Sequence, residues 1–120
     1  MDHPARSFGD LSVWRKAHEF VLGIYTFTAS FPKAESYGLA LQMRRAAVSV
    51  PGNIAEGFRR RGLADKTRFM NIAESSLDEV DYYLILSRDL GYGDTTKLSA
   101  AADEIGRMLS VYAKAIRESH

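Results

Sequence analysis

The 120-residue sequence contains no cysteine and only three prolines. Without cysteine the chain has no disulfide framework, no thiolate metal site and no cysteine nucleophile. A membrane-length apolar run is also missing, because the longest stretch without Asp, Glu, Lys or Arg, residues 20–32, is shorter than the ~20 residues that cross a bilayer. The first residues lack the basic start and apolar block of a secretory signal. We therefore expect a cytoplasmic protein without a membrane partner.

The sequence also lacks the common catalytic patterns. It has no Gly-x-x-x-x-Gly-Lys phosphate loop, no Gly-x-Ser-x-Gly elbow, and no Glu-x-x-His pair of the kind that holds iron in helical bundles. His18 falls on the predicted core side of a helix, where a buried, hydrogen-bonded role is expected. No nucleophile, base and orienting group come together in the pattern. We predict no enzymatic activity, no metal and no cofactor.

Charge and composition are those of an ordinary globular domain. Apolar residues make up 46% of the chain and charged residues 26%, and the formal net charge is +1. This length supports one hydrophobic core but not two. We expect a single domain spanning residues 1–120, with residues 1–9 as an N-terminal extension. The overall charge identifies no partner.

Four segments carry apolar residues near the 3.6-residue period, and strand patterns are missing. These segments are residues 11–30, 35–60, 64–90 and 95–117. Asp10 is placed to cap the first segment, and Pro32 ends it because proline pushes the residue before it out of the helical region. Gly91 is suited to the left-handed position that ends the third segment. The pattern predicts an all-α, antiparallel up-down-up-down four-helix bundle.

The first two predicted helices carry more apolar surface than the outer helix of a bundle requires. On the first, the stripe assigned to the core contains Leu11, Trp14, His18, Val21, Leu22 and Tyr25. On the second, the core stripe contains Leu39, Met43, Ala46, Ala47, Val50, Ile54 and Phe58. A further apolar stripe runs beside each, and contiguous exposed apolar patches usually mark interfaces. We predict a homo-oligomer with the contact residues Val13, Phe20, Ile24, Phe27, Leu41, Val48, Pro51 and Ala55.

A polar stripe separates the apolar stripes of the second helix. Its members are Gln42, Arg45, Ser49, Asn53 and Glu56. Polar groups between apolar stripes are costly to bury unless they satisfy one another. We expect a structural network in which Arg45 pairs with Glu56 and Ser49 and Asn53 lie between them. A ligand-binding or catalytic role for the same stripe is the alternative.

This segment also carries a family resemblance. Tyr37-Gly38-Leu39 and the run from Gln42 to Gly57, QMRRAAVSVPGNIAEG, resemble the signature of the 23S rRNA intervening-sequence proteins, also called the four helix bundle protein family. The flanking Val13-Trp14, Phe31-Pro32 and Ile72-Ala73 agree with it. The resemblance implies a homopentamer of four-helix subunits with no established enzymatic activity. Similar bundles are accessory proteins of diversity-generating retroelements, where they bind nucleic acid and a reverse transcriptase.

Basic residues outnumber acidic ones between Arg44 and Arg68. The candidate nucleic-acid-binding residues are Arg44, Arg59, Arg60, Arg61, Lys66 and Arg68. Arg59-Arg60-Arg61 falls at the predicted turn between the second and third helices, where arginines suit RNA or DNA phosphates. A solvated helix end is the alternative, since cations near a helix C-terminus are favoured in any case. No aromatic residue interleaves with the arginine cluster, so stacking of single-stranded bases is not expected.

Acidic residues dominate the third helix instead. Glu74, Asp78 and Asp81 form a stripe that is expected to face solvent, or to meet arginines of a neighbouring subunit or of a partner protein. Together these features predict a non-enzymatic oligomeric scaffold that binds RNA or DNA without sequence preference. The alternative function is a protein-binding adaptor that docks a partner such as a reverse transcriptase.

Overall fold

The structure, a computed structural model, describes residues 5–119 and contains four α-helices. The helices are α1 (Ser12–Thr28), α2 (Leu39–Arg59), α3 (Leu63–Asp89) and α4 (Thr96–Glu118). Two short 3-10 helices, η1 (Phe8–Asp10) and η2 (Lys33–Glu35), precede α1 and α2. No strand occurs within the described residues. The predicted helices agree with these bounds to within two residues, except that α2 begins four residues later, because η2 ends at Glu35 and residues 36–38 form a turn before Leu39.

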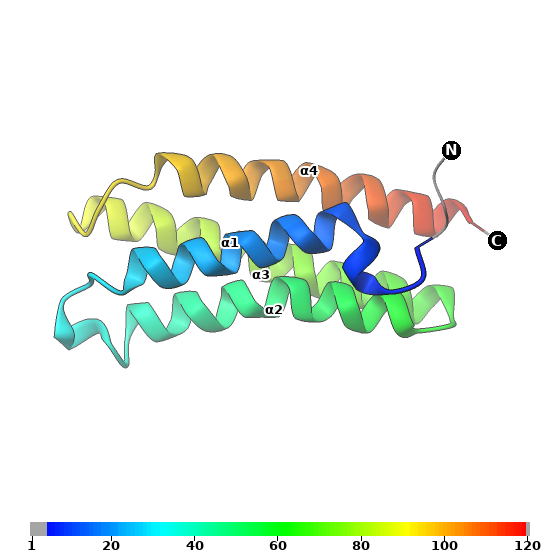
Figure 1. Cartoon of the computed structure of the whole chain (residues 1–120), viewed down its shortest axis with the longest axis horizontal. Helices are drawn as coiled ribbons and strands as arrows, with labels where there is room; N and C mark the ends of the chain where they lie inside the picture. Colours follow the sequence, from blue (N-terminus) through cyan, green and yellow to red (C-terminus); the bar gives the residue numbers. More distant parts are fainter. Residues whose placement is uncertain (1–4, 120) are drawn as a thin grey trace.

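The helices lie side by side in an elongated bundle of 48 × 27 × 19 Å (Figure 1). Each helix packs against the next in sequence, and α4 packs against α1 to close the bundle. The up-down-up-down prediction is therefore confirmed. The α2–α3 turn lies at the same end as the start of α1 and the end of α4 (Figure 1). The α1–α2 and α3–α4 connections lie at the opposite end.

Local sequence explains where the helices begin and end. α3 ends before Gly91, whose φ of 78° is the left-handed conformation expected there. Asp94 accepts a hydrogen bond from the Thr96 backbone N–H at 2.9 Å, which satisfies a donor at the start of α4. The capping prediction for Asp10 is wrong, because its carboxylate accepts from the Arg6 and Ser7 backbone N–H groups at 2.9 and 3.2 Å. Asp10 therefore caps the N-terminus of η1 and not that of α1.

The core uses the apolar stripe of α1 that was assigned to the oligomer. Val13, Phe20 and Ile24 are 4%, 3% and 0% exposed within this one chain, and Pro51 of α2 is buried as well. The prediction that these four residues join copies of the chain is wrong. The two neighbouring stripes of α1 have similar hydrophobicity, so a helical wheel does not show which of them is buried. Packing against α2 and α4 buries one stripe and leaves the other exposed. The stripe assigned to the core is largely the outer one, where Leu22, Tyr25 and His18 are exposed.

α2 and α3 form the most extensive helix pair of the bundle. Small residues allow their close approach: a Cβ on Gly57 would collide with Met70 and Phe69. The Ser49 and Ser76 hydroxyls share a hydrogen bond of 2.8 Å across this seam, and Ser87 Oγ lies 3.4 Å from Met43 Sδ. α2 continues through Pro51 without interruption. The core stripe predicted for α2 is buried from Leu39 to Ile54.

Phe20→Ala is expected to lower the free energy of unfolding by about 3–5 kcal/mol, because it removes a fully enclosed aromatic ring and leaves a cavity. Val111→Ala is the control, since Val111 is 69% exposed and its truncation is expected to cost less than ~0.5 kcal/mol. Urea unfolding followed by circular dichroism measures both. Equal and small losses would contradict the assignment of Phe20 to the core.

Candidate nucleic-acid interface

Cations from four separate segments meet at the end of the bundle that carries the α2–α3 turn. The up-down topology brings together the segment that leads into α1 with the first turn of α1, the end of α2, the start of α3 and the last turns of α4 (Figure 1). We call this surface the basic end, and its cationic residues are Arg6, Arg15, Arg59, Arg60, Arg61, Lys66, Arg68, Lys114 and Arg117. The acidic residues among them are fewer, namely Asp10, Glu56, Asp65 and Glu118. The field at this end is therefore strongly positive.

Aromatic rings support several of these guanidinium groups. Arg60 and Arg68 place their Cζ atoms 4.9 and 4.6 Å from the centroid of the Phe69 ring, and Arg59 lies 5.9 Å from that of Phe8. Such cation–π contacts restrain long side chains without neutralising their charge. The expectation that no aromatic residue interleaves with the arginine cluster is wrong, because the rings of Phe8 and Phe69 lie among these guanidinium groups.

Few of the charges at the basic end are neutralised. Arg60 pairs with Glu56 at 3.1 Å, Arg68 with Asp65 at 3.7 Å, and Lys114 with Glu118 at 4.0 Å. All six of these side chains are about half exposed or more, so each pair is worth at most about 1 kcal/mol and is screened by salt. Among residues 5–119, neither Arg59 nor Arg61 lies within ion-pairing distance of a carboxylate. These cations remain available to an external anion.

Arg44 does not belong to the basic end, which corrects its predicted grouping with the other arginines. Fifteen residues of helix separate it from Arg59, a distance of about 22 Å. Its Nε donates to Thr28 Oγ1 at 2.8 Å, its Nη2 donates to the Tyr25 carbonyl at 3.3 Å, and the guanidinium lies over the Tyr25 ring. Arg44 therefore joins α2 to the end of α1.

Lys66 is placed at the basic end but has a structural task there. Its Nζ donates to the Gly57 and Phe58 carbonyls at 3.2 and 2.9 Å. Both carbonyls belong to the last turn of α2, and the Gly57 carbonyl also accepts from the Arg60 backbone N–H at 3.2 Å. Lys66 thus fixes the turn that presents Arg59, Arg60 and Arg61.

A cleft of about 600 Å³ opens between α3 and α4 at this end. It is lined by Leu63, Ala64, Thr67, Arg68, Asn71 and Arg117. The hydroxyl, amide and guanidinium groups of this lining are donors that suit phosphate oxygens. Arg117 was missed in the sequence because it lies far from the arginine run. The up-down topology was the available signal, since it places the end of α4 beside the start of α3.

The predicted polar network of α2 forms only in part. Asn53 Nδ2 donates to the Ser49 carbonyl at 2.7 Å and to Ser49 Oγ at 2.9 Å, and Ser49 bonds to Ser76 of α3. The Arg45–Glu56 pair is wrong, because Glu56 pairs with Arg60 and both Arg45 and Glu56 are exposed. Eleven helical residues span about 16 Å, too far for direct pairing. Gln42 is exposed too and takes no part in this hydrogen-bonded group.

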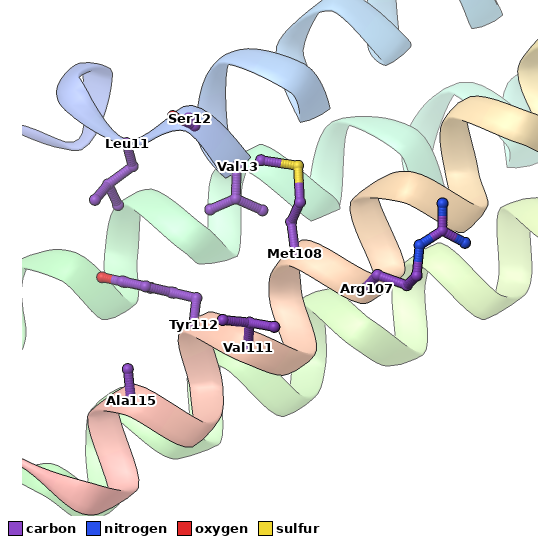
Figure 2. A pocket seen from close by; sticks show the side chains of 8 residues that line it. All are labelled: Leu11, Ser12, Val13, Arg107, Met108, Val111, Tyr112 and Ala115. Atoms are coloured by element: carbon purple, nitrogen blue, oxygen red, sulfur yellow. The ribbon is translucent and has the colours of Figure 1, made fainter.

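An apolar groove of about 460 Å³ lies between the start of α1 and α4 (Figure 2). Its lining residues are Leu11, Ser12, Val13, Arg107, Met108, Val111, Tyr112 and Ala115. Figure 2 shows the guanidinium of Arg107 pointing away from the apolar side chains at one end of the groove. Burial raises the pKa of Tyr112, so its hydroxyl stays protonated at neutral pH and does not serve as a base. The groove offers apolar contact.

The acidic stripe lies on the α3–α4 side, away from the basic end. Burial raises the pKa of Asp81, and the neighbouring carboxylates of Asp103 and Asp78 raise it further. Within residues 5–119 no set of three or more His, Cys, Asp or Glu side chains is placed to hold a metal ion. Among residues 5–119, Asp78, Asp81 and Asp103 form no ion pair with a basic side chain.

The fold and its charged end define a small helical-bundle protein with an exposed cationic surface. Residues 9–111 match the model of the 23S rRNA-intervening sequence protein family, and the chain belongs to that family. A solved structure with a similar fold is a protein with unknown function from the S23 ribosomal protein family of Bacteroides thetaiotaomicron VPI-5482. It is 24% identical, with a TM-score of 0.77, over 85% of this chain and 95% of its own.

The family match confirms the resemblance carried by the second helix. No curated protein is significantly similar to this chain in sequence. None of the four helices, as far as the described residues extend, is long and apolar enough to cross a membrane.

Glu56→Ala is expected to change the free energy of unfolding by less than ~0.5 kcal/mol, because it breaks only an exposed i,i+4 ion pair. Ile54→Ala, two residues away on the buried side of α2, is expected to cost about 2–5 kcal/mol and shows that the assay responds. Urea titration at neutral pH compares the two. A loss of several kcal/mol for Glu56→Ala would mean that its charge is buried in solution.

Asp81→Asn is expected to raise stability at neutral pH. The carboxyl has a pKa above its ordinary 3.8 in the folded chain, so its proton is held more tightly when folded. The stabilisation that comes from this tighter proton binding is fully present below the ordinary pKa of Asp81, and it is lost as the pH rises through the folded pKa. The advantage of the asparagine variant should therefore be present at pH 7, decline as the pH falls through the folded pKa of Asp81, and be absent below about pH 4. Equal stability of the two proteins at pH 7 would contradict it.

Proposed function

We propose that this chain is a non-enzymatic scaffold that assembles with copies of itself and binds RNA or DNA through the basic end. One observation carries the proposal: exposed cations from four separate segments of the chain converge on one end of the bundle, where few carboxylates oppose them. A cationic surface of this kind binds the phosphate backbone by releasing condensed counterions. It recognises charge and not base sequence.

The geometry of the arginines supports phosphate as the ligand. Guanidinium groups present a planar fork of donors that matches phosphate oxygens, and contact with Phe8 or Phe69 limits the entropy lost on binding. The cleft lined by Thr67, Arg68, Asn71 and Arg117 extends the same surface toward α4. An RNA or DNA strand that crosses the basic end would therefore contact hydrogen-bond donors from α2, α3 and α4.

Exposed apolar residues support the assembly. Leu22 and Tyr25 of α1 and Val48 of α2 are 55%, 43% and 45% exposed, and Leu41 and Ala55 lie half-buried on the same outer face of α2. Of the predicted interface residues, Leu41, Val48 and Ala55 thus keep that role in the proposal, whereas Phe27 packs against the core. The family resemblance implies five copies. A ring of copies multiplies the number of phosphate contacts without any new contact type.

The triple variant Arg59/Arg60/Arg61→Ala is expected to weaken binding to a labelled RNA or DNA duplex at least tenfold at low salt. Each lost phosphate contact should also reduce the slope of log affinity against log salt by ~0.9 for DNA. Fluorescence anisotropy at several salt concentrations measures both quantities.

The matched control is Lys33/Arg88/Lys97→Ala, which removes the same charge from the opposite end of the bundle. It is expected to leave affinity and salt slope close to those of the unaltered chain. Equal weakening by both variants would show that net charge, and not the basic end, controls binding. A chain with no affinity for either nucleic acid at low salt would instead favour the protein-binding adaptor.

A further inference from the structure

We propose that the apolar groove between the start of α1 and α4 is a docking site for an acidic amphipathic helix of a partner protein. This inference goes beyond the proposed function, because it concerns neither nucleic-acid binding nor the contact between copies of the chain. The groove has a volume of about 460 Å³, and none of Leu22, Tyr25 and Val48, which support self-association, belongs to its lining.

The floor of the groove is apolar and accessible to solvent. Figure 2 shows Met108 extending toward Val13 and Tyr112 extending toward Leu11, so that side chains of α4 and of the start of α1 form one floor. Val111 lies beside them and is 69% exposed, the highest value for a large apolar side chain within the helices of residues 5–119. A contiguous exposed apolar surface of this kind usually marks an interaction site.

The shape of the groove suits a helix. Its lining on α4 extends from Arg107 to Ala115, which corresponds to ~12 Å along the helix axis. That length covers two turns of a docked helix, whose apolar residues at i, i+3, i+4 and i+7 would lie in the groove. A furrow between two packed helices accepts the side-chain ridge of a third helix. Residues 5–119 contain no strand, so an extended peptide finds no sheet edge to which it could add.

Cations flank the groove on both sides. On α4, Lys114 follows Arg107 by two turns and lies on the same side of the helix. On α1, Arg15 Nη2 donates to the Ser12 hydroxyl of the groove lining at 3.3 Å. Within residues 5–119 neither Arg15 nor Arg107 forms an ion pair, and Lys114 lies 4.0 Å from Glu118. The margins of the groove are therefore positively charged.

The two features together specify the chemistry of the occupant. An apolar floor between cationic margins is complementary to a helix with leucine-like side chains along one face and carboxylates on both flanks of that face. Glu104, farther along the α1–α4 seam, is already paired with Lys16 at 3.4 Å and opposes such a helix only weakly. Contact between the same grooves of two copies is disfavoured, because it would bring these cations toward one another.

A labelled model peptide tests the site. The probe is a helix-forming peptide of about 14 residues, four turns, with leucine at i, i+3, i+4 and i+7 and glutamate on both flanks. Its control peptide carries lysine in place of every glutamate. Fluorescence anisotropy with the full chain should show micromolar binding of the acidic peptide and at least tenfold weaker binding of the basic one. The titration contains no nucleic acid, so its outcome is independent of the proposed function.

The first variant removes apolar contact without changing the charge. Val111→Gln is expected to weaken binding of the acidic peptide at least tenfold. Ile85→Gln makes the same kind of change at a 48% exposed position of α3 and should bind the peptide like the unaltered chain. Both side chains are exposed, so the fold is expected to persist, and circular dichroism checks it.

The second variant reverses the charge of the α4 margin. Arg107→Glu/Lys114→Glu should weaken the acidic peptide at least tenfold and strengthen the lysine peptide by a comparable factor. Lys33→Glu/Arg88→Glu reverses two exposed charges at the opposite end of the bundle and is the matched control. It should leave the affinity of both peptides close to that for the unaltered chain.

The other outcomes overturn the inference. An acidic peptide that does not bind the unaltered chain removes it, as do equal effects of Val111→Gln and Ile85→Gln or of the two charge reversals. Sedimentation velocity without peptide tests for a second copy: a smaller assembly in Val111→Gln than in the unaltered chain would assign the groove to self-association. Displacement of the peptide by decanoate at a lower concentration than by unlabelled peptide would assign the groove to a small amphiphile instead.

Discussion

Close packing of α2 against α3 is the constraint on which the rest of the molecule depends. Gly57 lets the helices approach, and the Ser49–Ser76 bond sets their relative height. A hydrogen-bonded pair across a small-residue seam resists sliding, because a shift of one turn would separate the hydroxyls and drive side chains into backbone. The position of the α2–α3 turn, and with it the arginine run, follows from this register. Lys66 then completes the turn by bonding the last carbonyls of α2.

The cations of this chain divide into two groups that the sequence does not distinguish. Arg44 and Lys66 direct their donors to backbone carbonyls or a hydroxyl and act as structural connections. Arg59 and Arg61 lie at the turn without a carboxylate partner among the described residues. A basic run in a helical sequence therefore overstates the charge that is free to bind a ligand. Burial and hydrogen bonding decide which members remain available.

Much of the fold was predictable because its signals are local. Gly91 fixes the end of α3 through backbone geometry, and the apolar period of α2 identifies its buried side. The buried side of α1 was not predictable, since Phe20 and Leu22 are equally apolar and only the neighbouring helices distinguish them. For the candidate site, the predicted turn between the second and third helices was enough to place Arg59, Arg60 and Arg61 together. Arg117 joins them only because the antiparallel arrangement puts the end of α4 beside the start of α3. The Arg45–Glu56 pair failed because sharing a face of a helix does not bring side chains into contact.

The separation of core and charged surface has a consequence for how such proteins diverge. The interior requires little more than aliphatic or small side chains on one stripe of each helix, a demand that many sequences meet. The arginines of the turn and the carboxylates of α3 occupy exposed positions whose replacement barely alters folding. A backbone shared with a protein of only 24% identity is what this division would produce. The distribution of surface charge can therefore change between relatives while the fold is kept, so the partners of one family member need not be the partners of another.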